Sequence, residues 1–151
     1  MEEIDLCWRL KKMGGRFLAV PESVVYHVGG GTLDYSSPNK VYLNFRNNLY
    51  MIVKNHEGWL FGKIFNRLSL DGLAALHFLF KGEFKKIGAV LKAHVSLYRH
   101  LGKLLKKRRE IKVMSTEFNS IGLYNGSLLW AFFFKGIRTF SALNQRLFRG
   151  D

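Results

Sequence analysis

Cysteine and proline are nearly absent from this sequence, and acidic residues are scarce. The 151 residues include one cysteine, Cys7, and two prolines. A single cysteine excludes an internal disulfide and favours a reducing compartment. Asp and Glu number 11 against 24 Lys and Arg, for a formal net charge of +13. This excess of positive charge predicts an anionic partner, either nucleic acid or an anionic membrane surface.

Long hydrophobic runs are also missing. The longest charge-free stretch within the apolar segment 59–80 is the nine residues 72–80, whereas a bilayer-spanning helix needs about 20 apolar residues. Residues 118–134 lack charge, but they include two asparagines and two serines. Neither segment is therefore expected to span a membrane. Acidic residues stand where a signal peptide would carry basic ones, so no signal peptide is expected either.

The sequence does contain enough apolar residues for a folded core, and its positive charge is unevenly placed. Hydrophobic residues make up 48% of the chain, which excludes disorder as the default, and the length suits one domain. Residues 1–56 hold 7 Lys and Arg against 5 Asp and Glu, whereas residues 57–151 hold 17 against 6. The anionic partner is therefore expected to meet the C-terminal two thirds.

Hydrophobic periodicity predicts an α+β chain that is mostly α. Residues 2–12 have helical spacing, with acids in the first turn and bases in the last. Residues 16–20 and 24–28 are rich in β-branched and aromatic side chains and predict two short strands. Ser37-Pro38 predicts the start of a second helix, with the serine as its cap. Amphipathic helices are then expected over 59–80 and 84–109.

Glu2, Glu3 and Asp5 at the start of the first helix are candidates for acid–base chemistry. On a helix, Glu2 and Asp5 share a face and Glu3 points elsewhere. A carboxylate facing a cleft could take a proton from a hydroxyl nucleophile. The same acids would also simply complement the helix dipole, and composition alone favours that interpretation.

A histidine followed by three glycines is a second candidate site. His27 lies near the end of the second predicted strand, and Gly29, Gly30, Gly31 and Thr32 come after that strand. Glycines let backbone N–H groups approach a phosphate closely, and an imidazole beside them could hold a divalent cation. An ordinary structural histidine next to a flexible loop is the alternative.

The segments EEIDLCWRL, PESVVYHVGGGT and YLNFRNNL, in this order, resemble the C-terminal end of the catalytic domain of family 2 glycosyltransferases. These enzymes have the GT-A fold and move a sugar from a nucleotide sugar to an acceptor. The resemblance covers residues 2–55. It implies a C-terminal piece of a GT-A α/β domain, namely a helix, two short strands and a helix.

The resemblance also assigns roles to the candidate residues. In that family the second member of an acidic pair is the catalytic base, which implies Glu3 here, with Glu2 as the alternative. Asp5 matches an acid with a structural role, and Trp8 on the same helix is expected to be structural too. The histidine that ends the strand, His27, implies a ligand to a divalent metal, Mg or Mn. Residues implied near the donor diphosphate or its loop are Gly29, Gly30, Gly31, Thr32, Arg46, Asn47 and Asn48.

The chain departs from the family in what it lacks. It contains no Asp-x-Asp and no Gln-x-x-Arg-Trp, and the family's nucleotide-binding units would precede Glu2. We therefore expect residues 1–55 to be the C-terminal end of a GT-A domain whose donor-binding part is missing, inactive by itself. Residues 56–151 are expected to form a separate basic helical region.

A basic amphipathic helix with aromatic residues on its apolar side is typical of a membrane interface. We therefore expect a peripheral protein at the cytoplasmic face of the plasma membrane, where a lipid-linked glycan acceptor would be presented. The alternative is a basic helical module that binds membrane or nucleic acid without catalysis. Nucleic acid is disfavoured because the aromatic residues lie on the apolar face and not among the lysines. The helices could also simply pack on one another.

Overall fold

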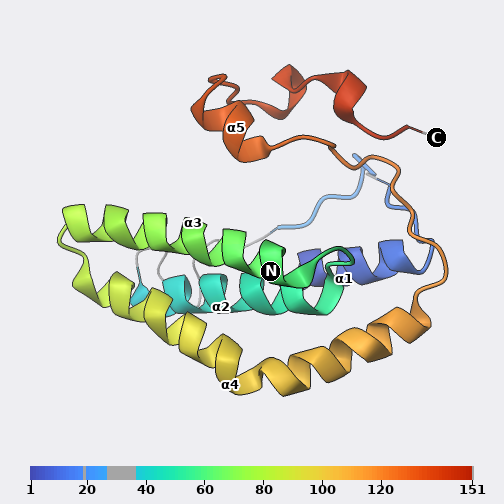
Figure 1. The fold of residues 1–151 in the computed structure, drawn as a ribbon. Helices are drawn as coiled ribbons and strands as arrows, with labels where there is room; N and C mark the ends of the chain where they lie inside the picture. Colours follow the sequence, from blue (N-terminus) through green and yellow to red (C-terminus); the bar gives the residue numbers. More distant parts are fainter. Residues whose placement is uncertain (19, 27–36, 151) are drawn as a thin grey trace.

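The structure is a computed structural model that describes residues 1–18, 20–26 and 37–150 (Figure 1). Helices make up 67% of the described residues, so the mostly α class is confirmed. In chain order the α-helices are α1 (Glu2–Lys12), α2 (Pro38–Asn55), α3 (Leu60–Phe80), α4 (Phe84–Met114) and α5 (Leu128–Phe133). Two short 3-10 helices follow, η1 (Phe140–Ala142) and η2 (Gln145–Leu147).

The prediction of two strands at 16–20 and 24–28 is wrong, because the described part of this region contains no strand. A strand is stable only when a neighbouring strand pairs with it, whatever its own composition. Here the side chains of Leu18, Val25 and Tyr26 are 83%, 83% and 95% exposed. The segment is therefore an extended connection with a turn after Val20, closed by a hydrogen bond from Ser23 N to Val20 O.

The predicted bounds of the first helix and the predicted start of the second are confirmed, because local signals set them. α1 ends where Gly14 adopts a φ of 81°, a conformation that glycine adopts without strain. Ser37 caps α2 by accepting a hydrogen bond from Asn39 N at 3.3 Å. Pro38 occupies the first turn, where no partner for its missing N–H is needed.

α3 and α4 form an antiparallel pair (Figure 1) that reverses at Gly82, whose φ is 69°. α4 continues to Met114, five residues beyond the predicted end at Arg109. Its buried stripe explains the extension, because Leu97, Leu104 and Ile111 recur every seven residues and are all buried. The additional residues 110–114 therefore extend the buried stripe by Ile111.

The core lies between α2 and α4, which make the most extensive contact of any two helices described. Leu49 and Val53 of α2 meet Leu97 and Leu104 of α4, and all four are at most 5% exposed. α3 packs on both helices through Leu60, Ile64 and Leu68. The core thus joins residues on both sides of the boundary predicted at residue 55.

After α4 the chain returns to α1 before it forms the C-terminal segment. Asn119 N donates to Lys11 O at 2.8 Å, and Lys11 Nζ donates to Ile121 O at 2.7 Å. An isolated antiparallel bridge joins Tyr124 to Phe148. Figure 1 shows α5 and the residues after it set apart from α2 and α4.

Candidate functional site

Asp5 fixes α1 against the C-terminal end of α2. Its carboxylate accepts hydrogen bonds from Lys54 Nζ at 2.8 Å and from Asn55 Nδ2 at 2.7 Å. Arg9 Nε lies 3.3 Å from the same carboxylate. Asp5 is only 14% exposed and Asn55 is fully buried. Asp5 therefore connects the two helices through residues 49 and 50 positions away in sequence.

Three further residues predicted for the site come together on the same two helices. Asn47 Nδ2 donates to Glu2 Oε1 at 3.4 Å. Arg46 donates to Asn47 Oδ1 from Nε at 3.0 Å and from Nη2 at 2.8 Å. The Arg46 guanidinium also lies over the rings of Tyr42 and Tyr50, at 5.2 and 5.7 Å from their centroids. Arg46 is thus held in place on α2, next to the residue that contacts Glu2.

The two candidate bases face solvent. The side chains of Glu2 and Glu3 are 83% and 84% exposed. The Met1 amino group donates to Glu3 at 3.0 Å, and this hydrogen bond raises the pKa of the amino group. The three acids at the start of α1 therefore have two different environments, a buried one for Asp5 and a solvated one for Glu2 and Glu3.

The predicted metal and phosphate residues lie outside the described residues. These are His27, Gly29, Gly30, Gly31 and Thr32. Among the residues that are described, no three His, Cys, Asp or Glu side chains are grouped so that they could hold a metal ion. The role of His27 as a ligand to Mg or Mn therefore stays a prediction. Asn48, on α2, lies next to Asn47 and is half-buried.

Trp8 lines an apolar pocket between α1 and the segment that returns to it. The pocket holds about 380 Å³. Its walls are Ile4, Cys7, Trp8, Lys11, Phe118 and Leu123. The sequence predicts the apolar stripe on α1, but nothing local indicates that residues more than 100 positions later cover it.

A buried ionic cluster between α3 and α4 was not predicted. Asp71 is 1% exposed, with Arg67 Nη2 at 2.6 Å and His94 Nε2 at 3.2 Å from its carboxylate. Burial raises the pKa of the Asp71 carboxyl, and Arg67 and His94 counteract it only in part. The pairing of Arg67 with Asp71 at helical spacing is a signal in the sequence, but it does not show that the pair is buried.

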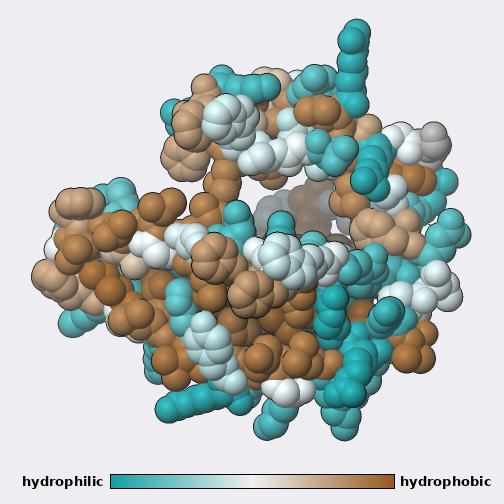
Figure 2. All heavy atoms as spheres, in the orientation of Figure 1, coloured by the Kyte–Doolittle hydropathy of each residue, from teal (hydrophilic) through white to brown (hydrophobic). Residues whose placement is uncertain are grey.

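An apolar groove runs between α3 and α4 and holds about 610 Å³. Its outer edges are Phe61 and Phe65 of α3, 71% and 64% exposed, and Tyr98 of α4, 62% exposed. The rest of the wall is Val53, Leu60, Ile64, Leu68, Leu97, Leu101 and Leu105. Figure 2 shows hydrophobic residues gathered over these two helices. In the described ranges, no helix has both the length and the apolarity to cross a membrane.

No known protein family, curated protein or solved structure matches this chain. Its function is therefore inferred from the sequence motifs and from the geometry described above.

Proposed function

We propose that this chain forms the C-terminal part of the catalytic domain of a family 2 glycosyltransferase and attaches it to an anionic membrane. The reaction is transfer of a sugar from a nucleotide sugar to an acceptor such as a lipid-linked glycan. The observation that supports the proposal is the contact between the two helices that carry the resembling motifs. Asn47 of α2 bonds to Glu2 of α1, and Asp5 of α1 is held by Lys54 and Asn55 of α2.

This arrangement suits the roles that the resemblance implies. Asp5 fixes the first turn of α1, and Glu3 and Glu2 then project from a rigid support, as a general base requires. Glu3, or Glu2 in its place, takes the proton of the acceptor hydroxyl as that oxygen attacks the sugar. Arg46, positioned by Asn47, supplies positive charge for the diphosphate that leaves. His27 would hold the divalent metal, whose role is to neutralise that diphosphate.

Transfer from a nucleotide sugar tests the catalytic proposal. The gene product that contains these residues is assayed in membranes with radiolabelled nucleotide sugars, as wild type and as Glu3→Gln, Glu2→Gln and Glu22→Gln. Loss of the general base lowers the rate on the order of 10² to 10⁴-fold, whereas Glu22, exposed in the loop after Pro21, leaves it unchanged. If Glu3→Gln and Glu2→Gln both transfer sugar as fast as the control Glu22→Gln, neither Glu3 nor Glu2 is the general base.

The membrane part of the proposal places the protein at the cytoplasmic face of the plasma membrane, as a peripheral protein. The exposed apolar groove between α3 and α4 supports it, because apolar side chains beside many lysines suit an anionic interface. The same observation favours a second candidate function, a membrane-binding module without catalysis. The two differ in the transfer assay, since only the first makes a labelled product that depends on Glu3 or Glu2.

A further inference from the structure

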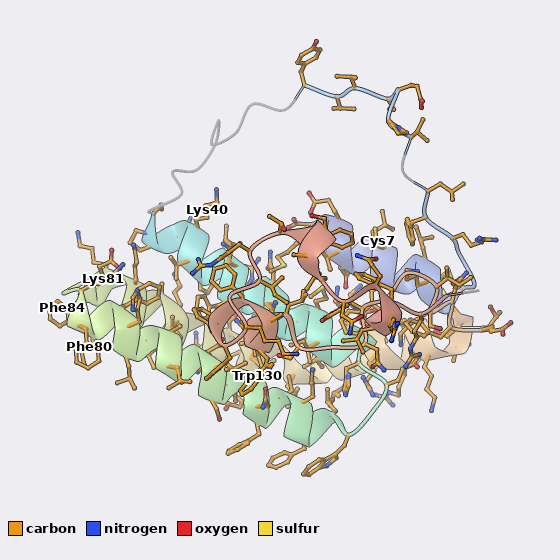
Figure 3. All side chains as sticks on the ribbon, turned by 90° about the horizontal axis from the view of Figure 1, so that it is seen from above. Cys7, Lys40, Phe80, Lys81, Phe84 and Trp130 are labelled. Atoms are coloured by element: carbon orange, nitrogen blue, oxygen red, sulfur yellow. The ribbon has the colours of Figure 1, made fainter. Side chains whose placement is uncertain are left out.

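The exposed apolar residues of α3 and α4 form one continuous surface, which we call the docking face. On α3 the exposed residues Phe61, Phe65, Leu76 and Leu79 follow helical spacing, and on α4 Phe84, Leu91, Val95 and Tyr98 do the same. Phe61, Phe65 and Tyr98 border the same groove, so the two stripes lie on one side of the helix pair. Figure 3 shows Phe80, Lys81 and Phe84 together at the end where α3 turns into α4. Such a contiguous exposed surface marks an interaction site.

A basic stripe runs along α4 beside the docking face. Lys92, Arg99, Lys103 and Lys106 are all exposed, and their spacing of seven, four and three residues puts them on one side of the helix. Between positions 59 and 114 the chain holds 13 Lys and Arg against 3 Asp and Glu. A partner of the docking face therefore meets apolar side chains and positive charge together.

We propose that the docking face binds an anionic phospholipid bilayer and that the groove takes an acyl chain, with the lipid phosphate beside the basic stripe of α4. The proposal rests on the membrane attachment proposed above and assigns the surface that makes it. Aromatic side chains are favoured at headgroup depth, and each Lys or Arg near anionic lipid contributes about 1 kcal/mol. A second copy of the chain is a poorer occupant, because it would bring two basic stripes together.

Vesicle binding by matched variants tests the proposal. Phe65→Glu puts a carboxylate at the edge of the groove, and Leu73→Glu makes the same charge change at a residue of α3 that is 62% exposed and does not line the groove. Both sites are exposed, so circular dichroism should show unchanged helix content. The whole chain is sedimented with phosphatidylcholine vesicles that contain or lack phosphatidylglycerol. Tryptophan quenching by brominated acyl chains, measured in a background with Trp8→Phe and Trp130→Phe, reports insertion near Trp59.

We expect binding only with phosphatidylglycerol, with about tenfold or greater weakening in Phe65→Glu and little change in Leu73→Glu. Quenching should disappear in the first variant and persist in the second. If vesicle binding is equal in all three proteins, or is lost equally in both variants, the groove is not the acyl-chain site. The membrane attachment would still hold in that case. No binding to any vesicle would overturn both. A dimer in sedimentation velocity that Phe65→Glu dissociates would show that a second copy occupies the face.

Discussion

Asp5 and Glu2 lie one helical turn apart on α1, yet their surroundings differ. Asp5 accepts two short hydrogen bonds from α2 and is mostly buried. Glu2 is 83% exposed, and its contacts are longer, at 3.4 Å to Asn47 and 3.5 Å to the Met1 amino group. Buried acceptors stabilise a fold when they are paired, and a partner left unpaired costs its desolvation. Surface carboxylates contribute little. Asp5, which supports the candidate site, is thus buried, whereas Glu2 and Glu3, the candidate bases, lie in solvent.

A pair of alanine variants should show this separation. Asp5→Ala leaves Lys54 and the buried Asn55 without their carboxylate, so we expect a loss of about 1–3 kcal/mol in the free energy of unfolding. Glu2→Ala should change that free energy by no more than about 0.5 kcal/mol. Urea unfolding followed by circular dichroism measures both. Similar losses in the two variants would contradict the assignment of Asp5 as the residue that joins α1 to α2.

Asp71 should make stability depend on pH in a defined direction. Burial raises the pKa of its carboxyl, so the folded protein holds this proton more tightly than the unfolded chain does. Its contribution to stability is full below the unfolded pKa and is lost as pH rises through the folded pKa. We expect the free energy of unfolding of the wild type, relative to Asp71→Asn, to fall as pH rises from the unfolded pKa of about 4.

Glu83 is the matched control for this pH dependence. A hydrogen bond from Lys86 lowers the pKa of the Glu83 carboxyl, so its contribution is present above the unfolded pKa and is lost as pH falls. Relative to Glu83→Gln, the wild type should therefore gain stability as pH rises to the unfolded pKa of about 4.5, by a small amount because Glu83 is solvated. Urea unfolding from acidic to neutral pH gives the two signs. If the free energy of unfolding changes with pH in the same direction in both comparisons, the buried environment assigned to Asp71 is wrong.

At the scale of elements, the sequence predicts what local chemistry decides and misses what distant contacts decide. Ser37 and Pro38 start α2 through bonds within three residues, and the prediction from sequence is confirmed. The strand predicted over 24–28 fails because a strand needs a partner, and Val25 and Tyr26 project into solvent. The same limit applies to the site. The acids on α1 are recognisable as a motif, but their contacts with Asn47 and Asn55 depend on packing across about 50 positions.

The C-terminal end of α2 depends on α4 in a way that one substitution can test. Arg108 Nη1 donates to the carbonyls of His56 and Val53, the latter at 3.1 Å, where the helix leaves its last carbonyls without internal partners. Because the donor is charged, Arg108→Ala should lower the free energy of unfolding by about 1.5–3 kcal/mol. Lys107→Ala removes an exposed neighbour and should change it by no more than about 0.5 kcal/mol. Urea unfolding of both proteins measures the difference, and equal effects would mean that the bonds to α2 contribute nothing.

At the scale of the molecule, burial is concentrated in one place. The four leucine and valine residues between α2 and α4 are almost fully buried, whereas α5 and the residues after it expose most of their aromatic rings. Local stability follows buried apolar contact, so different parts of one chain open with different free energies. We therefore expect backbone amides of α2 and α4 to exchange with solvent far more slowly than those of α5.

Two leucine truncations make this expectation quantitative. Leu97→Ala creates a cavity between α2 and α4 and should lower the protection of both helices together, by about 2–5 kcal/mol. Leu129→Ala on α5, where the side chain is 52% exposed, should leave the protection of α2 and α4 within about 0.5 kcal/mol of the wild type. Hydrogen exchange followed by mass spectrometry of peptides from α2, α4 and α5 measures both effects. If Leu129→Ala lowers protection in α2 and α4 as much as Leu97→Ala does, the C-terminal segment is part of the same cooperative unit. In that case the core between α2 and α4 does not by itself determine the stability of the protein.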